Sequence, residues 1–310
     1  MIRVKCEYDP RERASMRQFT IRMLLLVSGF VVSSLTGCNG KGGRQEAKKQ
    51  KAPAAAVPSP PGYDLGAPVK FVLGEMLREI SGITFLRGNQ DTVYAIEDET
   101  GGLYSFHLGG GVHRWHFGGH GDYEDVTVLS DNEFVVLRSD GSLFIFPVGA
   151  RSKKMVRAYQ HILPPGEYEG LFGDKDGKLI AMCKNCGIDD QSKEVSAYVL
   201  GYDANHTLGV RDHFKIVVPG EKLTSIHKHI KFHPSCLARH PLTGDWYVVS
   251  SVNKVLIVFN GRWQVREMYA LDSTLFKQPE GLAFDREGNM YISNEGGEGR
   301  ANVLLFRYKK

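Results

Sequence analysis

The chain has 310 residues, of which 42% are hydrophobic and 24% are charged, so it can bury the core of one large domain or two small ones. Its formal net charge of +4 comes largely from basic residues near the N-terminus, which is typical of a targeting segment rather than a nucleic-acid-binding face. The sequence contains no helix-turn-helix, RNP-like or zinc-finger pattern, so we expect no nucleic-acid partner. The 35 glycines, together with aromatic and β-branched runs, favour an all-β fold.

The first segment of the chain has the features of an export signal. Basic residues precede an apolar run at residues 23–32, which is too short to span a bilayer comfortably but fits the core of a signal peptide. The segment ends in Leu-Thr-Gly before Cys38, the pattern of a bacterial lipobox whose cysteine is lipidated. We therefore predict a signal peptide over residues 1–37. Met16 is a second candidate for its start, because the stretch before it is unusually polar.

Residues 38–68 are rich in Lys, Ala, Gly and Pro and lack apolar periodicity, which predicts a flexible tether with an extended proline-rich end. Acyl chains on Cys38 would attach this tether to a membrane, and one chain alone would bind only marginally. Asn39, rather than Asp, follows the cysteine, which favours the outer membrane or the periplasmic face over retention at the inner membrane. We expect a lipid-anchored protein of the cell envelope.

Five short segments of the remaining chain resemble one another and indicate an internal repeat. Each has a polar residue, then a mostly small residue, then an aliphatic one, and each is followed by a turn and a β-rich run. The polar positions are spaced by 43, 45, 66 and 45 residues, close to the roughly 40–50 residues of a propeller blade. The segments are Ser81-Gly82-Ile83, Glu124-Asp125-Val126, Glu169-Gly170-Leu171, Ser235-Cys236-Leu237 and Glu280-Gly281-Leu282.

The repeat predicts a five-bladed β-propeller over residues 69–310. The last unit has only three strand-like runs, whereas the run from Val69 to Leu73 precedes the first unit and belongs to none. We expect this N-terminal strand to supply the outer strand of the last blade and so close the ring. The long third interval could hold an inserted loop or a degenerate sixth blade. We favour the insertion, because only one extra strand-like run, Phe214 to Val218, is visible there, and a β-sandwich fits the regular spacing less well.

At these residues the chain resembles the SdiA-regulated, YjiK-like family. The resemblance is carried by the EISGI start, the YEDV and YEGL segments, HPSCLARHPLTGDWYVVSS and QPEGLAFDREGNMYISNEGG, and it covers essentially residues 70–310. It implies a five-bladed propeller, distantly similar to NHL-repeat propellers, with a bound calcium ion and no established reaction. Two of the five repeat positions carry a serine, Ser81 and Ser235, so not every blade offers a carboxylate.

The repeat also predicts a metal site on the propeller axis. Residues at one repeat position lie at the same height in the ring, so Glu124, Glu169 and Glu280 should converge near one mouth of the channel. Crowded carboxylates repel one another unless a cation intervenes, and Ca²⁺ accepts roughly six to eight oxygen ligands in flexible geometry. The alternative is that each glutamate only accepts backbone N–H groups of the neighbouring blade. Further oxygens or pocket groups could come from Ser81, Asp125, Ser235, Glu97, Asp98 and Glu295.

A single CxxC pair lies in the third unit. Export favours oxidation, so Cys183 and Cys186 are candidates for a local disulfide, which would close only a small loop and stabilise little. Two free thiols are the second alternative. A zinc site is the third, and one CxxC without a second such pair is a weak pattern for it. The zinc alternative would add one of three histidines, His227, His229 and His233.

Two classes of function fit this sequence. The rigid funnel of a propeller suits recognition of a small ligand or an envelope protein, and we expect a monomer that acts by binding. The alternative is a metal-dependent hydrolase of the esterase, lactonase or phytase-like kind, since these chemistries occur on related propellers. The sequence shows no G-x-S-x-G elbow and no convincing Ser-His-Asp set. A phosphohydrolase would need several basic residues at the carboxylate face, for which the candidates are Arg138, Lys184 and Arg239.

Overall fold

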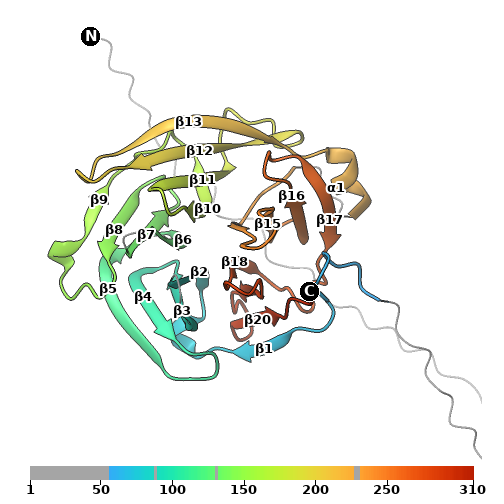
Figure 1. Cartoon of the computed structure of the whole chain (residues 1–310), viewed down its shortest axis with the longest axis horizontal. Coiled ribbons are helices and arrows are strands. Elements are labelled where there is room, and N and C mark those ends of the chain that lie inside the picture. The colour runs from blue at the N-terminus through green and yellow to red at the C-terminus, as the bar shows by residue number, and fades with distance from the viewer. Residues whose placement is uncertain (1–55, 87–88, 130–131, 227–230) are drawn as a thin grey trace, which may run out of the picture. The chain divides into compact units, whose positions relative to one another are not determined.

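Five four-stranded antiparallel sheets surround a central axis and form a five-bladed β-propeller, as the repeat predicts (Figure 1). The computed structural model describes residues 56–86, 89–129, 132–226 and 231–310. None of the helices in these ranges has the length and apolar character needed to cross a membrane. The signal peptide and Cys38 lie outside the described residues, so their assignments stay predictions.

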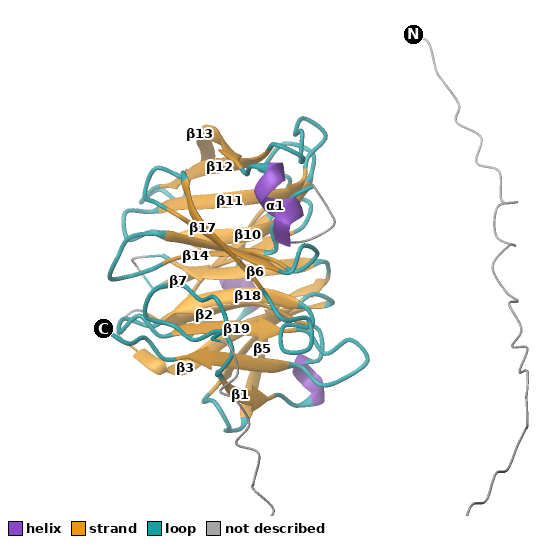
Figure 2. Cartoon of the chain, turned by 90° about the vertical axis from the view of Figure 1, so that its right-hand side faces the viewer, coloured by secondary structure: helices purple, strands orange, loops and turns teal. Residues whose placement is uncertain are grey.

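The first four blades take their strands in chain order from the axis outward, and Figure 2 shows the blades from the side. The first blade contains β2 (Ile80–Leu86), β3 (Asn89–Glu97), β4 (Thr100–Phe106) and β5 (Val112–His120). The second contains β6 (Tyr123–Val128), β7 (Glu133–Arg138), β8 (Leu143–Pro147) and β9 (Arg157–Tyr159). The third contains β10 (Glu167–Gly173), β11 (Lys178–Asn185), β12 (Glu194–Tyr202) and β13 (Leu208–Val217). The fourth contains β14 (Cys236–Arg239), β15 (Trp246–Ser250), β16 (Val255–Phe259) and β17 (Val265–Ala270).

The fifth blade is completed from the other end of the chain. Its inner three strands are β18 (Pro279–Phe284), β19 (Met290–Asn294) and β20 (Asn302–Phe306), and its outer strand is β1 (Val69–Val72). The outer strand pairs antiparallel with β20, Val69 opposite Leu305, so the predicted closure by an N-terminal strand is confirmed. The pairing covers an edge of β20 that would otherwise be open to other chains.

The long third interval holds no sixth blade. The run from Phe214 to Val218, which looked like an extra strand, is largely the end of β13, an ordinary fourth strand. The added length lies in the segments on either side of β12 and β13, and the second of these contains the helix α1 (Gly220–Ile226). This helix lies on the outside of the propeller beside β17 (Figures 1 and 2).

The packed domain begins earlier than the predicted tether of residues 38–68 would allow. Tyr63 and Leu65 are buried in the hydrophobic cluster that joins the fourth and fifth blades. The Tyr63 hydroxyl donates to the Gly288 carbonyl, and the Lys309 N–H donates to the Gly62 carbonyl at 2.8 Å. Burial of these two apolar side chains outweighs the loss of chain entropy that the proline-rich composition suggested.

The aliphatic residue of each repeat segment explains how the blades stack. Each of these residues is at most 4% exposed, and each belongs to a different one of the five hydrophobic clusters. The side chains of an inner strand point toward the adjacent blades, because the strand presents its edge to the axis. The five residues are Ile83, Val126, Leu171, Leu237 and Leu282. The repeated pattern in the sequence is therefore the signature of the packing between blades.

The small residue of each segment marks where neighbouring inner strands touch. A Cβ atom on Gly281 would lie 2.5 Å from the Ser81 carbonyl oxygen, and one on Gly82 would lie 2.6 Å from Asp125 Cα. A Cβ on Gly170 would lie 2.5 Å from Leu237 Cδ2. Glycine, which has no Cβ atom, permits this close approach, so neighbouring inner strands are in contact at this level of the channel.

Candidate metal-binding mouth

The glutamate of three repeat segments lies at a β-bulge. In the pairing of β6 with β7, Tyr123 faces Arg138 and Asp125 faces Leu137, so Glu124 has no partner residue. Glu169 and Glu280 are skipped in the same way at the starts of β10 and β18. A bulge redirects the side chain of the unpaired residue. Three bulges at the same height therefore turn three carboxylates toward the axis.

The three glutamates meet at one end of the channel, which we call the glutamate mouth. Each carboxylate is electrostatically coupled to at least one of the others: Glu124 to Glu169 and Glu280, and Glu169 to Glu280. Glu169 is 6% exposed, whereas Glu124 and Glu280 keep partial access to solvent. The structure thus brings together the residues that the repeat placed together.

Lys184, at the end of β11, lies among these carboxylates. Its ammonium group forms an ion pair with Glu169, and the charges of Glu280 and Glu124 also act on it. Burial lowers the pKa of Lys184, but the three carboxylates outweigh this effect and raise it. Lysine and cation would compete for the same negative charge, because both are attracted to the same oxygens.

Burial is the main cause of the raised pKa values of the three glutamates in this mouth. It raises the pKa of Glu169 to about 8, with the charge of Glu280 adding to the rise and Lys184 opposing it. It also raises the pKa of Glu124, helped by the charges of Glu169 and Asp122, and that of Glu280. One lysine does not balance the carboxylates, so the mouth favours either a proton or a cation.

One oxygen of this mouth has no partner among the described residues. Glu169 Oε2 is buried and unbonded, while Oε1 is held by Lys184. Ser235, which is 2% exposed, lies beside Glu169 and Glu280, and its hydroxyl lowers the pKa of both carboxyl groups against the larger effect of burial. A buried carboxylate oxygen without a donor is costly unless a ligand satisfies it. A donor set of carboxylate and hydroxyl oxygens suits a hard cation such as Ca²⁺.

Asp125 does not join this donor set. Its side chain is 3% exposed and accepts the N–H groups of Val126 at 2.8 Å and Leu171 at 2.7 Å. The second bond crosses from one blade to the next, so the role considered for the glutamates, acceptance of backbone N–H groups, belongs to their neighbour instead. Burial raises the pKa of Asp125 well above its usual range.

Glu97 also has a local structural role. Its carboxylate accepts the N–H groups of Glu99 at 3.2 Å and Thr100 at 2.9 Å, as well as the Thr100 hydroxyl, and so holds the turn after β3. Ser81 is buried, and its backbone carbonyl accepts the Ser293 hydroxyl at 2.8 Å. Glu97 therefore stabilises a turn of the first blade, and the Ser81 carbonyl links that blade to β19 of the fifth.

Asp98 and Glu295 extend the negative charge beside the glutamate mouth. Burial and the charges of Glu79 and Glu97 raise the pKa of Asp98 to about 6, and its buried Oδ1 has no partner in the part of the chain that the structure describes. Burial and a hydrogen bond with Glu79 raise the pKa of Glu295 to about 8, where the charge of Glu280 also contributes. The charges of Glu280 and Asp98 both act on Glu295, so these two residues lie close to the glutamate mouth.

Of the three basic residues considered for a phosphate-binding face, Lys184 alone contacts the glutamates. Arg138 is engaged by Asp140, with Nη2 to Oδ2 at 2.6 Å, and by Gln160 at 2.9 Å. Arg239 ends β14 and lines a cavity at the opposite end of the channel. The glutamate mouth therefore carries an excess of carboxylates, which disfavours a phosphorylated substrate.

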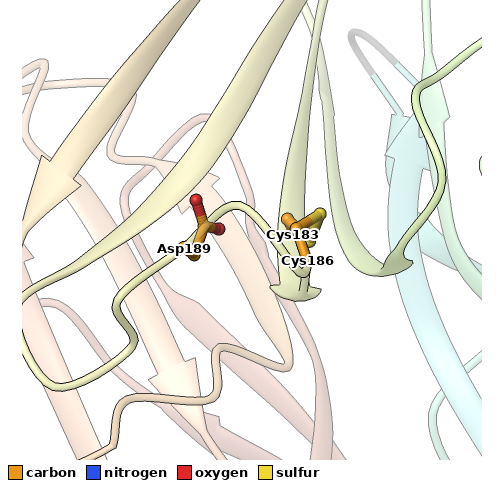
Figure 3. Close-up of side chains that lie close together, drawn as sticks. All are labelled: Cys183, Cys186 and Asp189. Atoms are coloured by element: carbon orange, nitrogen blue, oxygen red, sulfur yellow. A yellow bond between two sulfur atoms is a disulfide. The ribbon is translucent and has the colours of Figure 1, made fainter.

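Cys183 and Cys186 form a disulfide (Figure 3). Together with Asp189 they make the one group of three His, Cys, Asp or Glu residues in the described part of the chain whose ligand atoms all lie within 4.8 Å of each other. The disulfide removes the thiolates that a zinc ion requires, and Asp189 is already bound by Ser196 and Lys215. His227 and His229 lie outside the described residues. Cys236 is a buried free thiol.

The carboxylate oxygens of the three glutamates do not all lie within 4.8 Å of one another, so they are not yet close enough to bind one ion together. Ca²⁺–oxygen distances are about 2.3–2.6 Å, so the side chains must close around an ion and displace the Lys184 ammonium. Glutamate side chains have the rotatable bonds for such a change. The residues present fit a cation site that forms on binding.

No protein-family model matches the chain, and a comparison with curated proteins finds no match. Among solved structures, a luciferin-regenerating enzyme is similar to 78% of this chain over 95% of its own length, with 12% identity and a TM-score of 0.50. A streptogramin B lyase covers 78% of this chain with 98% of its own, at 9% identity and a TM-score of 0.47. The calcium-binding protein regucalcin from Agrobacterium tumefaciens covers 76% with 74% of its own, at 16% identity and a TM-score of 0.43. Such low identities show likeness of fold alone, and the resemblance to the SdiA-regulated family stays a prediction.

Proposed function

We propose that this chain is a cell-envelope lipoprotein whose propeller binds calcium at the glutamate mouth and recognises a ligand or protein through that calcium-bound surface. The observation that carries the calcium proposal is the convergence of three bulge glutamates with a buried, unbonded carboxylate oxygen. A bound Ca²⁺ would supply the positive charge that the carboxylates lack and could leave coordination positions open for an acidic or carbonyl-bearing ligand. Glu124, Glu169, Glu280 and Ser235 would hold it.

The experiment is a calcium titration followed by thermal melting. At about one hundred times its Kd, calcium should stabilise the native state by about 2.7 kcal/mol, which raises the Tm by roughly 5–10 °C for a domain of this size. The double variant Glu124→Gln with Glu280→Gln should remove the rise, because it removes two charged ligands. Glu221→Gln, on the exposed first turn of α1, is the matched control and should keep it.

The absence of any Tm rise in the unaltered protein would refute the calcium proposal. The hydrolase alternative is tested separately with a panel of lactone and phosphoester substrates in the presence of calcium. Turnover that is lost in the double glutamine variant would replace binding with catalysis as the role of the mouth. Turnover in both proteins alike would indicate a contaminant.

The membrane proposal depends on Cys38. Metabolic labelling with a radioactive or clickable fatty acid should mark the expressed chain, and Cys38→Ser should abolish both the label and recovery in the membrane fraction. A labelled Cys38→Ser protein would overturn this assignment without affecting the calcium proposal.

A further inference from the structure

A second cavity opens at the other end of the channel, which we call the far mouth. Its volume is about 490 Å³, within the range of roughly 300–1,000 Å³ that is typical of small-molecule sites. The ends of all five inner strands line it, and none of the three glutamates does. It reaches inward to the level where the repeat glycines bring neighbouring inner strands into contact. It is therefore separate from the glutamate mouth.

Three phenylalanines from different blades give the far mouth an aromatic wall. Phe85, Phe172 and Phe284 all line the cavity, and each is only partly buried. Each is held from behind by another aromatic ring: Phe85 by Tyr291 with ring centroids 4.7 Å apart, and Phe172 by Trp246 at 4.8 Å. Rings fixed in this way offer apolar area at little cost in side-chain entropy, which suits a flat aromatic ligand.

Arg239 gives the far mouth a positive charge without a counter-ion. Its Nε donates to the Gly244 carbonyl at 3.2 Å, and its guanidinium carbon lies 5.5 Å from the centre of the Trp246 ring. No described residue forms an ion pair with Arg239. Four other arginines, Arg78, Arg138, Arg157 and Arg266, each form an ion pair with a carboxylate. A guanidinium held by a carbonyl and a ring keeps further N–H donors for an anion.

The other polar groups of the cavity agree with an anionic ligand. His240 is 1% exposed, its Nδ1 accepts the N–H groups of Leu242 and Thr243 at 3.2 Å, and its buried Nε2 has no partner among the described residues. A neutral histidine with an accepting Nδ1 carries its proton on Nε2, so this ring adds no negative charge to the cavity. Asp125 has both oxygens engaged, and Asp174 accepts the Lys175 N–H within its own turn.

We propose that the far mouth binds a small aromatic molecule that carries one anionic group, with its rings against the three phenylalanines and its anion on Arg239. This site is independent of the calcium proposal, because Arg239 and the three phenylalanines lie at the opposite ends of the inner strands from the glutamates. The ligand class is defined by an aromatic body and a carboxylate or sulfonate. Neutral aromatics of the same shape should bind more weakly, because they leave the guanidinium without an anion.

The test uses a matched pair of fluorescent probes, 1-anilinonaphthalene-8-sulfonate and its uncharged counterpart N-phenyl-1-naphthylamine, titrated into the full folded protein without calcium. The sulfonate should bind about tenfold more tightly than the neutral probe, as expected for one hydrogen-bonded charge pair. Arg239→Gln should remove this preference and leave the neutral probe unchanged. Arg211→Gln, on the exposed outer strand β13, is the control and should change neither probe.

Two further variants locate the site. Phe172→Leu with Phe284→Leu should weaken both probes, because it removes aromatic area but keeps the cavity apolar. Glu124→Gln with Glu280→Gln should leave both unchanged, which separates this site from the glutamate mouth. Equal binding of the two probes, or the same sulfonate affinity in Arg239→Gln and Arg211→Gln, would overturn the proposal.

Discussion

The two ends of the propeller channel are built from the same five strands but differ in chemistry. At the glutamate mouth, the strands begin with bulges that turn Glu124, Glu169 and Glu280 toward the axis. At the far mouth, where the same strands end, phenylalanines and Arg239 line the opening. The repeat places equivalent side chains at the same height at each mouth. The local backbone, such as a bulge, determines whether those side chains face the axis. One fold can therefore present a cation site and an anion site at opposite ends of the channel.

The contact layer between the mouths is the most sensitive part of this arrangement. Gly281→Ala would place a Cβ atom 2.5 Å from the Ser81 carbonyl oxygen, where neither backbone can yield cheaply. We expect a loss of about 3 kcal/mol in the free energy of unfolding and a Tm lower by roughly 10 °C. Gly111→Ala, which meets no atom within 4 Å, should change the Tm little. Equal melting of the two variants would show that the inner strands are not in contact.

Lys184 provides a second test of the difference between the two mouths, because a cation that binds the glutamates must displace its ammonium group. Lys184→Gln should increase the affinity for calcium by about tenfold, since it removes a charge that competes for the same oxygens. It should also lower the Tm of the calcium-free protein, because Glu169 loses its ion pair. Isothermal titration calorimetry measures the first effect. Lys178→Gln, at the exposed start of β11, is the control, and a weaker affinity in Lys184→Gln would mean that the lysine assists the cation.

The two mouths should also differ in their response to pH, although this effect is the smallest. The pKa of Glu169 is raised to about 8, above its ordinary value of 4.5, so its stabilising contribution is complete below 4.5 and is lost as the pH rises through 8. With a chelator present to remove calcium, the Tm should therefore fall as the pH is raised from 6 to 9. Calcium should reduce this fall and bind more tightly at the higher pH, because protons no longer compete.

Sulfonate binding at the far mouth should change little over the same range, because the probe and an arginine both keep their charges. Probe fluorescence and calcium calorimetry on one protein sample provide the comparison. A calcium affinity that is the same at pH 6 and pH 9 would argue against binding by these carboxylates.

The sequence predicts the fold and the principal glutamates because both depend on periodicity. Segments spaced by one blade occupy equivalent positions in a ring, so Glu124, Glu169 and Glu280 could be assigned to one level before any coordinates were known. The closure by Val69–Val72 followed from a missing strand in the last unit. These inferences need only the order and spacing of residues.

The remaining features depend on register and on contacts between blades, which spacing does not encode. Asp125 follows a predicted ligand directly, yet its hydrogen bond to Leu171 makes it a link between blades. Arg239 was considered as a partner of the glutamates, but it ends its strand and lies at the opposite mouth. Tyr63 was assigned to the tether because prolines surround it, whereas tertiary packing buries it. Lys184 was one of three basic candidates for the carboxylate face, and its contact with Glu169 depends on the register of β11, which the spacing of basic residues does not encode.

The pairing of β1 with β20 also sets the order of events during biogenesis. The strand that completes the fifth blade is made before every other strand of the propeller, and its partner, Asn302–Phe306, is made after all of them. A nascent chain in which β20 has not yet been synthesised cannot close the propeller, because β1 then has no strand to pair with. For the exported protein that we propose, the ring therefore closes only after all five blades have crossed the membrane, and until then the chain can still pass through a translocation pore.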